Sequence, residues 1–137
     1  MFRHIMVPID LHMPPEVKKA IEVAAQLAEW QGAKVTIVSV TGSQPGDTHM
    51  TSEAIEREMK TCAREIAKQS GRQVDTRNIY SVDVAVEIDK NLTRTAEEIG
   101  ADLIVVGTHA PRITDYIFSS HAEYLAKHTT MSVFVVR

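Results

Sequence analysis

Two pairs of side chains in this sequence have the types and spacing that acid–base or nucleophilic chemistry requires. Asp10 lies two residues before His12, and Ser120 directly precedes His121. A carboxylate can orient an imidazole, and an imidazole can accept the proton of a serine hydroxyl. An enzyme also needs a third group that orients the base, and neither pair has one nearby in the sequence. We therefore expect no turnover of a diffusible substrate.

Histidine and cysteine side chains raise the question of a metal site. His12, His109 and His121 are the three histidines that could converge, but no two histidines have the spacing of helical metal ligands and no cysteine accompanies them. The sequence therefore predicts no dedicated metal site. Cys62 falls on the apolar stripe of a predicted helix, which indicates a buried, unreactive thiol.

Composition excludes several classes of protein. An apolar fraction of 44% and a charged fraction of 24% are typical of a globular domain, and they argue against disordered, collagen-like and disulfide-scaffold proteins. The net charge of −3 offers no electrostatic attraction to nucleic acid or to an anionic membrane. The first ten residues lack the apolar core and cleavage site of a signal peptide, and the single cysteine favours a reducing compartment. We expect one domain, residues 1–137, in the cytoplasm.

Apolar runs alternate with amphipathic segments along the chain. The runs predict five strands, at Ile5–Ile9, Val35–Val40, Arg77–Val82, Asp102–Val106 and Ser132–Val136. Apolar residues three and four apart predict four helices. The first runs from Pro14 to Gly32, the second has its apolar stripe at Ile55–Ile66 and ends at Gly71, the third has its stripe at Ile88–Ile99 and is stopped by Gly100, and the fourth runs from about Ile113 to Lys127. Residues 41–51 are predicted to form a loop. This alternation predicts an α/β fold, an open parallel sheet with helices on both faces. Trp30, near the end of the first helix, is predicted to be an ordinary packing residue.

Three residues follow or end predicted strands at the same edge of this sheet. In open α/β sheets, ligands bind at the carboxyl ends of the strands, near the point where strand order reverses. Asp10, Val40 and Gly107 lie at those ends. Each also has a structural interpretation: Gly107 can form a tight turn, and Asp10 can cap a helix or face solvent.

Three segments resemble the universal stress protein family. They are MFRHIMVPID at the start, ADLIVVGTHAPRITDYIF after the third predicted helix, and SVFVVR at the end. Residues His109–Ser120 look most like the F and G branch of the family. The resemblance covers nearly the whole chain and implies an open five-stranded parallel sheet in the order 3-2-1-4-5, a Rossmann-like arrangement, with four helices.

The resemblance also implies a site for ATP, with Mg²⁺. In the family, Asp10 corresponds to the aspartate that contacts the ribose or the metal–phosphate end, and Val40 to the residue whose backbone contacts adenine. A phosphate site needs backbone N–H groups that converge at a helix N-terminus. The residues implied to bind the cofactor are Pro8, Ile9, Asp10, Val40, Gly107, Thr108, His109, Ala110, Arg112, Ser119, Ser120 and His121.

This sequence departs from the family's glycine motif. Gly107 is present, but Ala110 occupies the second glycine position and Ser119 or Ser120 the third. An added Cβ costs about 1 kcal/mol where the backbone needs a positive φ, so weak nucleotide binding is expected. Asp83 stands near a position where relatives often have glycine, and its carboxylate would repel phosphates if it faced the cleft.

Two functions from different classes fit these residues. The first is a nucleotide-binding switch in the stress response, in which bound ATP orders residues 41–52 and alters a surface for unknown protein partners. The alternative is a nucleotide-free dimeric interaction protein with a degenerate ATP cleft. Both include a homodimer through Ser132–Arg137, because an apolar edge strand is an aggregation hazard unless it is paired. Some relatives hydrolyse ATP slowly or phosphorylate themselves, and we expect at most such activity from this protein.

Overall fold

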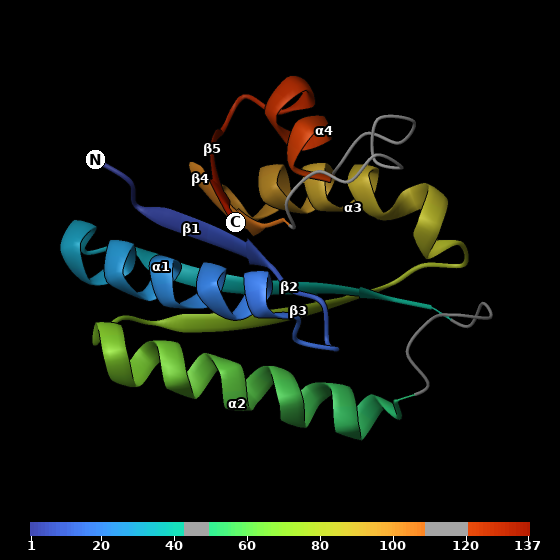
Figure 1. Cartoon of the computed structure of the whole chain (residues 1–137), viewed down its shortest axis with the longest axis horizontal. Coiled ribbons are helices and arrows are strands. Elements are labelled where there is room, and N and C mark those ends of the chain that lie inside the picture. The colour runs from blue at the N-terminus through green and yellow to red at the C-terminus, as the bar shows by residue number, and fades with distance from the viewer. Residues whose placement is uncertain (43–49, 109–120) are drawn as a thin grey trace.

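A computed structural model describes residues 1–42, 50–108 and 121–137 of the chain (Figure 1). Strands and helices alternate through the described residues. In chain order they are β1 (His4–Pro8), α1 (Pro15–Gln31), β2 (Lys34–Thr41), α2 (Ser52–Ser70), β3 (Val74–Tyr80), α3 (Val84–Ile99), β4 (Leu103–Gly107), α4 (His121–His128) and β5 (Ser132–Val136).

The five strands form one sheet in the order β3-β2-β1-β4-β5, and every neighbouring pair is parallel. The fold class, sheet order and four helices expected from the sequence are confirmed. Strands β2 and β3 lie on one side of β1, and β4 and β5 lie on the other side. Strand order therefore reverses between β1 and β4.

Helices cover both faces of the sheet, and each face has its own apolar core (Figure 1). Ile5, Val7 and Ile37 face α1 and α2, whereas Met6 and Val38 face α3 and α4. The side chains of a strand alternate between faces, so the three inner strands, which are buried on both sides, need nearly continuous apolar sequence. This requirement explains why β1, β2 and β4 were recognisable as apolar runs.

The amino end of the sheet is fixed by the carboxylate of Asp102. Its oxygens accept hydrogen bonds from the backbone N–H groups of Arg3, at 2.9 and 3.2 Å, and of His4, at 3.0 Å. The buried ring of His4 makes a 2.7 Å hydrogen bond to the hydroxyl of Thr36. Burial lowers the pKa of His4 below its ordinary value of 6.5, and the nearby Lys34 lowers it further.

The predicted bounds of the third strand and the predicted packing of Trp30 were wrong. The third strand begins at Val74 rather than Arg77 and ends at Tyr80, because Val74 pairs with Val35 and packs on the core beneath α2. Helices α2 and α3 begin at Ser52 and Val84, directly after Thr51 and Asp83, whose side chains cap their first turns. Trp30 is not a packing residue, since it is 78% exposed near the end of α1.

The fourth helix and the predicted loop are only partly described. Helix α4 runs from His121 to His128, and residues 113–120 of the predicted helix lie outside the described residues. Thr41 belongs to β2 rather than to the loop, and residues 43–49 also lie outside the described part of the chain.

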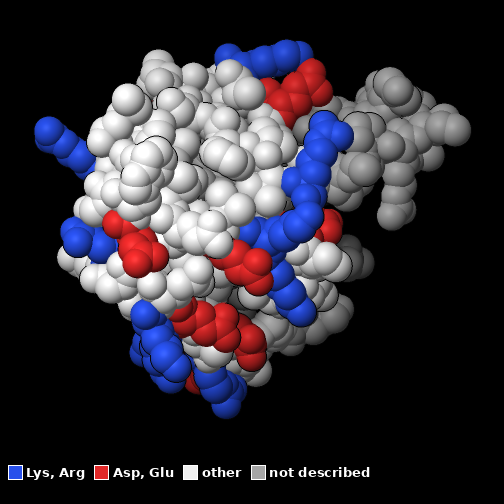
Figure 2. All heavy atoms as spheres, turned by 60° about the vertical axis from the view of Figure 1, so that its left-hand side comes forward, with Lys and Arg blue, Asp and Glu red and all other residues white. Residues whose placement is uncertain are grey.

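No helix among the described residues is long and apolar enough to cross a membrane. On the face shown in Figure 2, acidic and basic side chains are mixed.

Candidate functional site

The structure brings Asp10, Val40 and Gly107 to one edge of the sheet. Pro8 of β1 pairs with Val38 of β2, and Asp10 and Val40 each lie two residues beyond that pair. Met6 pairs with Ile104, so Gly107 reaches the level of Ile9 on the other side of β1. This edge contains the carboxyl ends of the strands on both sides of the strand-order reversal. Such a position is the general ligand site of open α/β sheets.

Asp10 organises the loop that connects β1 to α1. Its Oδ1 accepts hydrogen bonds from the backbone N–H of His12, at 2.8 Å, and lies 2.9 Å from Nδ1 of the His12 ring. The Asp10 carbonyl accepts a further hydrogen bond from the N–H of Met13, which has a φ of +50°. Oδ2 makes no hydrogen bond to the described residues, and the side chain is 55% exposed. Asp10 is therefore a turn residue, and one of its carboxylate oxygens has no partner in the described part of the chain. Pro14, not Asp10, occupies the cap position of α1.

Gly107 is required by packing, not by a tight turn. A Cβ at this position would lie 2.4 Å from the carbonyl oxygen of Glu16 and 3.0 Å from the backbone nitrogen of Val17, both in α1. Gly107 ends β4 without a positive φ. Its neighbour Thr108 donates its N–H to the carbonyl of Val136, at 2.8 Å, and so extends the pairing with β5. The glycine lets the first turn of α1 approach the sheet edge closely.

Pro8, Ile9 and Val40 form the strand ends around this edge. Pro8 is the last residue of β1, where a missing N–H is tolerated. The N–H of Ile9 donates to the carbonyl of Val38, at 2.8 Å, and its side chain is buried among the residues beneath α1. Val40 is partly buried and packs against the core on the opposite face.

His121, predicted to line the nucleotide site, is held by α3. His121 is the first residue of α4, and its Nδ1 lies 2.7 Å from Oδ1 of Asp89 in α3. Five other residues predicted to bind the nucleotide lie outside the described residues, so their positions relative to the sheet edge are not described: His109, Ala110, Arg112, Ser119 and Ser120. Within the described ranges, no group of three or more His, Cys, Asp and Glu side chains could hold a metal ion.

Asp83 caps helix α3. Its Oδ1 accepts a 3.3 Å hydrogen bond from the N–H of Val86, and the carboxylate thereby complements the positive end of the helix dipole. Two residues earlier, the buried Ser81 donates its hydroxyl to Glu87, at 2.7 Å. The carboxylate that would repel phosphates if it faced the cleft thus has a structural role at the start of α3.

Sequence reasoning missed a partly buried polar cluster between β2 and β3, in which Ser39 and Thr41 are buried. The Ser39 hydroxyl donates to Oδ1 of Asn78, at 2.8 Å, and the Asn78 amide donates to the Thr41 hydroxyl, at 3.1 Å. Ser39 and Thr41 are two residues apart in β2 and so lie on the same face of the strand, which was the available signal. On the same face, Cys62 is buried as predicted, and burial raises the pKa of its thiol to about 11. The thiol is therefore protonated at neutral pH.

Comparisons with known proteins agree over the length of the chain. The sequence model described as "Universal stress protein family" matches residues 1–137. Universal stress protein G of Salmonella typhimurium is 23% identical over 146 residues, and that of Escherichia coli O157:H7 is 21% identical, each covering 100% of both chains.

Solved structures show the same fold at low identity. A universal stress protein in complex with cAMP superposes with a TM-score of 0.72 at 20% identity, covering 99% of this chain and 97% of the other. The universal stress protein from Archaeoglobus fulgidus in complex with dAMP gives a TM-score of 0.72 at 19% identity, covering 98% of both chains. With the sheet order and the family match over residues 1–137, these findings establish that the chain belongs to the universal stress protein family.

Proposed function

We propose that this protein binds an adenine nucleotide, ATP with Mg²⁺, at the edge formed by the carboxyl ends of β1, β2 and β4. The observation that carries the proposal is the position of Asp10 at the sheet edge where the carboxyl ends of β1, β2 and β4 flank the strand-order reversal. The relatives in complex with cAMP and dAMP support an adenine nucleotide as the ligand class.

The described residues at this edge are suited to different parts of the ligand. The Oδ2 atom of Asp10, which has no hydrogen bond to the residues that the structure describes, suits a ribose hydroxyl or a hydrated Mg²⁺, because Mg²⁺ prefers oxygen ligands. The backbone of Val40 suits the edge of the adenine ring. In the proposal, the phosphates lie at Gly107 and Thr108, with His109, Ala110, Arg112, Ser119 and Ser120 completing their site.

Binding acts as a switch in this proposal. ATP orders the connection between β2 and α2 and thereby changes a surface for protein partners during stress, in the cytoplasm. Gly107 gives no independent support for a ligand, because the contact with α1 already explains it. The nucleotide site therefore rests on the sheet edge and on Asp10.

A homodimer through Ser132–Arg137 is proposed with or without a nucleotide. β5 is an edge strand of the sheet, and its Phe134 and Val135 are 45% and 40% exposed. Exposed apolar side chains beside unpaired backbone groups favour pairing with a second chain. The alternative function, a dimeric interaction protein that binds no nucleotide, depends on this surface alone.

The test is to identify any nucleotide that purified protein carries. Protein is denatured, released nucleotides are identified by chromatography and mass spectrometry, and the emptied protein is titrated with Mg-ATP by calorimetry. Asp10→Asn keeps the acceptor for the His12 N–H and is expected to weaken binding about tenfold through loss of the charge. Glu29→Gln, on exposed α1 surface, is the matched control and is expected to change nothing. Protein that is empty and ignores millimolar Mg-ATP would leave the dimeric interaction protein.

A further inference from the structure

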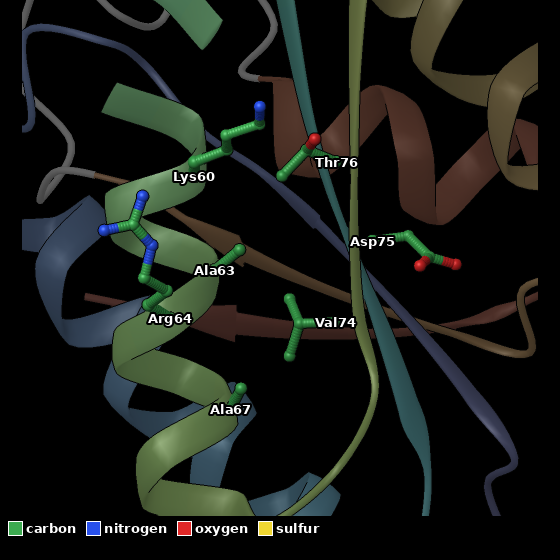
Figure 3. Close-up of a pocket in the computed structure, with 7 residues that line it drawn as sticks. All are labelled: Lys60, Ala63, Arg64, Ala67, Val74, Asp75 and Thr76. Atoms are coloured by element: carbon green, nitrogen blue, oxygen red, sulfur yellow. The ribbon is translucent and has the colours of Figure 1, made fainter. Parts of the chain in front are cut away.

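A groove runs between helix α2 and the edge strand β3, away from the proposed nucleotide site (Figure 3). Its volume is about 550 Å³, and its lining residues are Lys60, Ala63, Arg64, Ala67, Val74, Asp75 and Thr76. In Figure 3, Lys60 and Ala63 of α2 project toward Val74 and Thr76. Arg64 extends along the helix, and Asp75 points to the other side of the strand. The groove exists because alanines, the smallest side chains available, line α2 beside the strand.

The outer edge of β3 offers unpaired backbone groups along this groove. Among the described residues, β3 pairs with β2 only, and it therefore ends the sheet. The carbonyl of Gln73 accepts from Val35, and the N–H of Ser81 donates to Thr41. In a parallel strand, every second residue directs its backbone N–H and C=O groups to the same neighbouring strand. Because Gln73 and Ser81 bond to β2, the backbone groups of residues 75, 77 and 79, which lie between them at this spacing, also face β2. The backbone N–H and C=O groups of residues 74, 76, 78 and 80 consequently face outward.

Two of the three charged residues that line the groove, Lys60 and Asp75, have ion-pair partners among the described residues. Lys60 lies 2.8 Å from Glu56, and its ammonium lowers the pKa of that carboxyl. Asp75 lies 3.4 Å from Lys34. Arg64 makes no ion pair or side-chain hydrogen bond with the described residues, and exposed Lys68 lies one helical turn beyond it. The groove thus retains a positive charge that favours a carboxylate partner.

The open shape of the groove suits an extended chain better than a small molecule. Small-molecule sites bury most of the ligand surface, whereas this groove follows an exposed strand edge. An added strand gains main-chain hydrogen bonds and places every second side chain on the same face. We propose that β3 accepts an extended peptide segment of a partner protein as a sixth strand. A small apolar side chain of that segment packs on Ala63, Ala67 and Val74, and an acidic side chain two residues away pairs with Arg64.

The probe is the blocked peptide Thr-Thr-Val-Thr-Glu-Thr-Thr, added to ¹⁵N-labelled protein and followed by NMR. We expect saturable shifts concentrated in the amides of residues 74, 76, 78 and 80 and in the turn of α2 around Ala63–Ala67. Replacing the glutamate of the peptide by lysine is expected to weaken binding about tenfold, and N-methylation of its alternate amides is expected to abolish it.

Variants of the protein separate the groove from general charge effects. Arg64→Glu is expected to weaken binding about tenfold, whereas Lys18→Glu, the same charge change on exposed α1 surface, is expected to leave it unchanged. Ala67→Leu is expected to fill the groove and reduce binding, with unchanged spectra elsewhere showing that the variant is folded. Absence of shifts at millimolar peptide, shifts that survive N-methylation, or equal binding of inorganic phosphate at Arg64 would overturn the proposal.

Discussion

Replacing Gly107 by alanine tests the close approach of α1 to the sheet edge. The new Cβ would lie 2.4 Å from the carbonyl oxygen of Glu16 and 2.7 Å from its carbonyl carbon, where ordinary contacts begin at 3.4 Å. The first turn of α1 must therefore retreat by about 1 Å, and close-packed interiors resist such shifts. Overpacking of this kind costs about 1–3 kcal/mol, which corresponds to a fall in melting temperature of about 3–15 °C for a domain of this size.

The assay is thermal unfolding of nucleotide-free protein, followed by circular dichroism. Gly71→Asn is the control, because Gly71 has a φ of +65° that asparagine tolerates, and no atom lies within 4 Å of an added Cβ. We expect only a small loss of stability from this control. If the melting temperature of Gly107→Ala were unchanged without nucleotide, the packing argument would be wrong and the glycine would have to serve a ligand.

Three further predictions concern the rest of the fold. Because burial lowers the pKa of His4, the unfolded chain binds a proton at this side chain more readily than the folded chain, so the free energy of unfolding should fall as pH drops below about 6.5. The slope is at most about 1.4 kcal/mol per pH unit, and denaturant titrations of His4→Gln should show a flatter one. Asp102→Asn should lose about 1–2 kcal/mol, measured in the same way, because two backbone N–H groups lose a charged acceptor. Val135→Lys should give monomers by light scattering, and a dimer that persists would refute pairing through β5.

Much of the fold was predictable because the central strands are buried on both faces. Their apolar runs need no partner information to be recognised, as at Val35–Val40 and Leu103–Val106. Strand β3 was misplaced because an edge strand is half exposed, and its sequence from Asp75 to Asn78 is polar. The glycines that end α1, α2 and α3 were correctly identified, since each has the left-handed conformation that glycine favours.

The site was less predictable because its residues have partners distant in sequence. Local spacing could place Gly107 after a strand, but it could not show that Glu16 of α1 packs against it. The same holds for His121, whose partner Asp89 belongs to another helix, and for Asn78, which bonds to Ser39 and Thr41. For Asp10, spacing found the pair with His12 but not the turn that the carboxylate stabilises.

The most direct test of the nucleotide site is an NMR titration of emptied, ¹⁵N-labelled protein with Mg-ATP. The proposal predicts saturable shifts centred on the amides of Asp10, Val40, Gly107 and Thr108, at the carboxyl edge of the sheet. The amides of Arg3, His4 and Asp102, at the amino end of the same strands, should not move. No shift at millimolar Mg-ATP, or shifts centred on any other part of the molecule, would contradict the account.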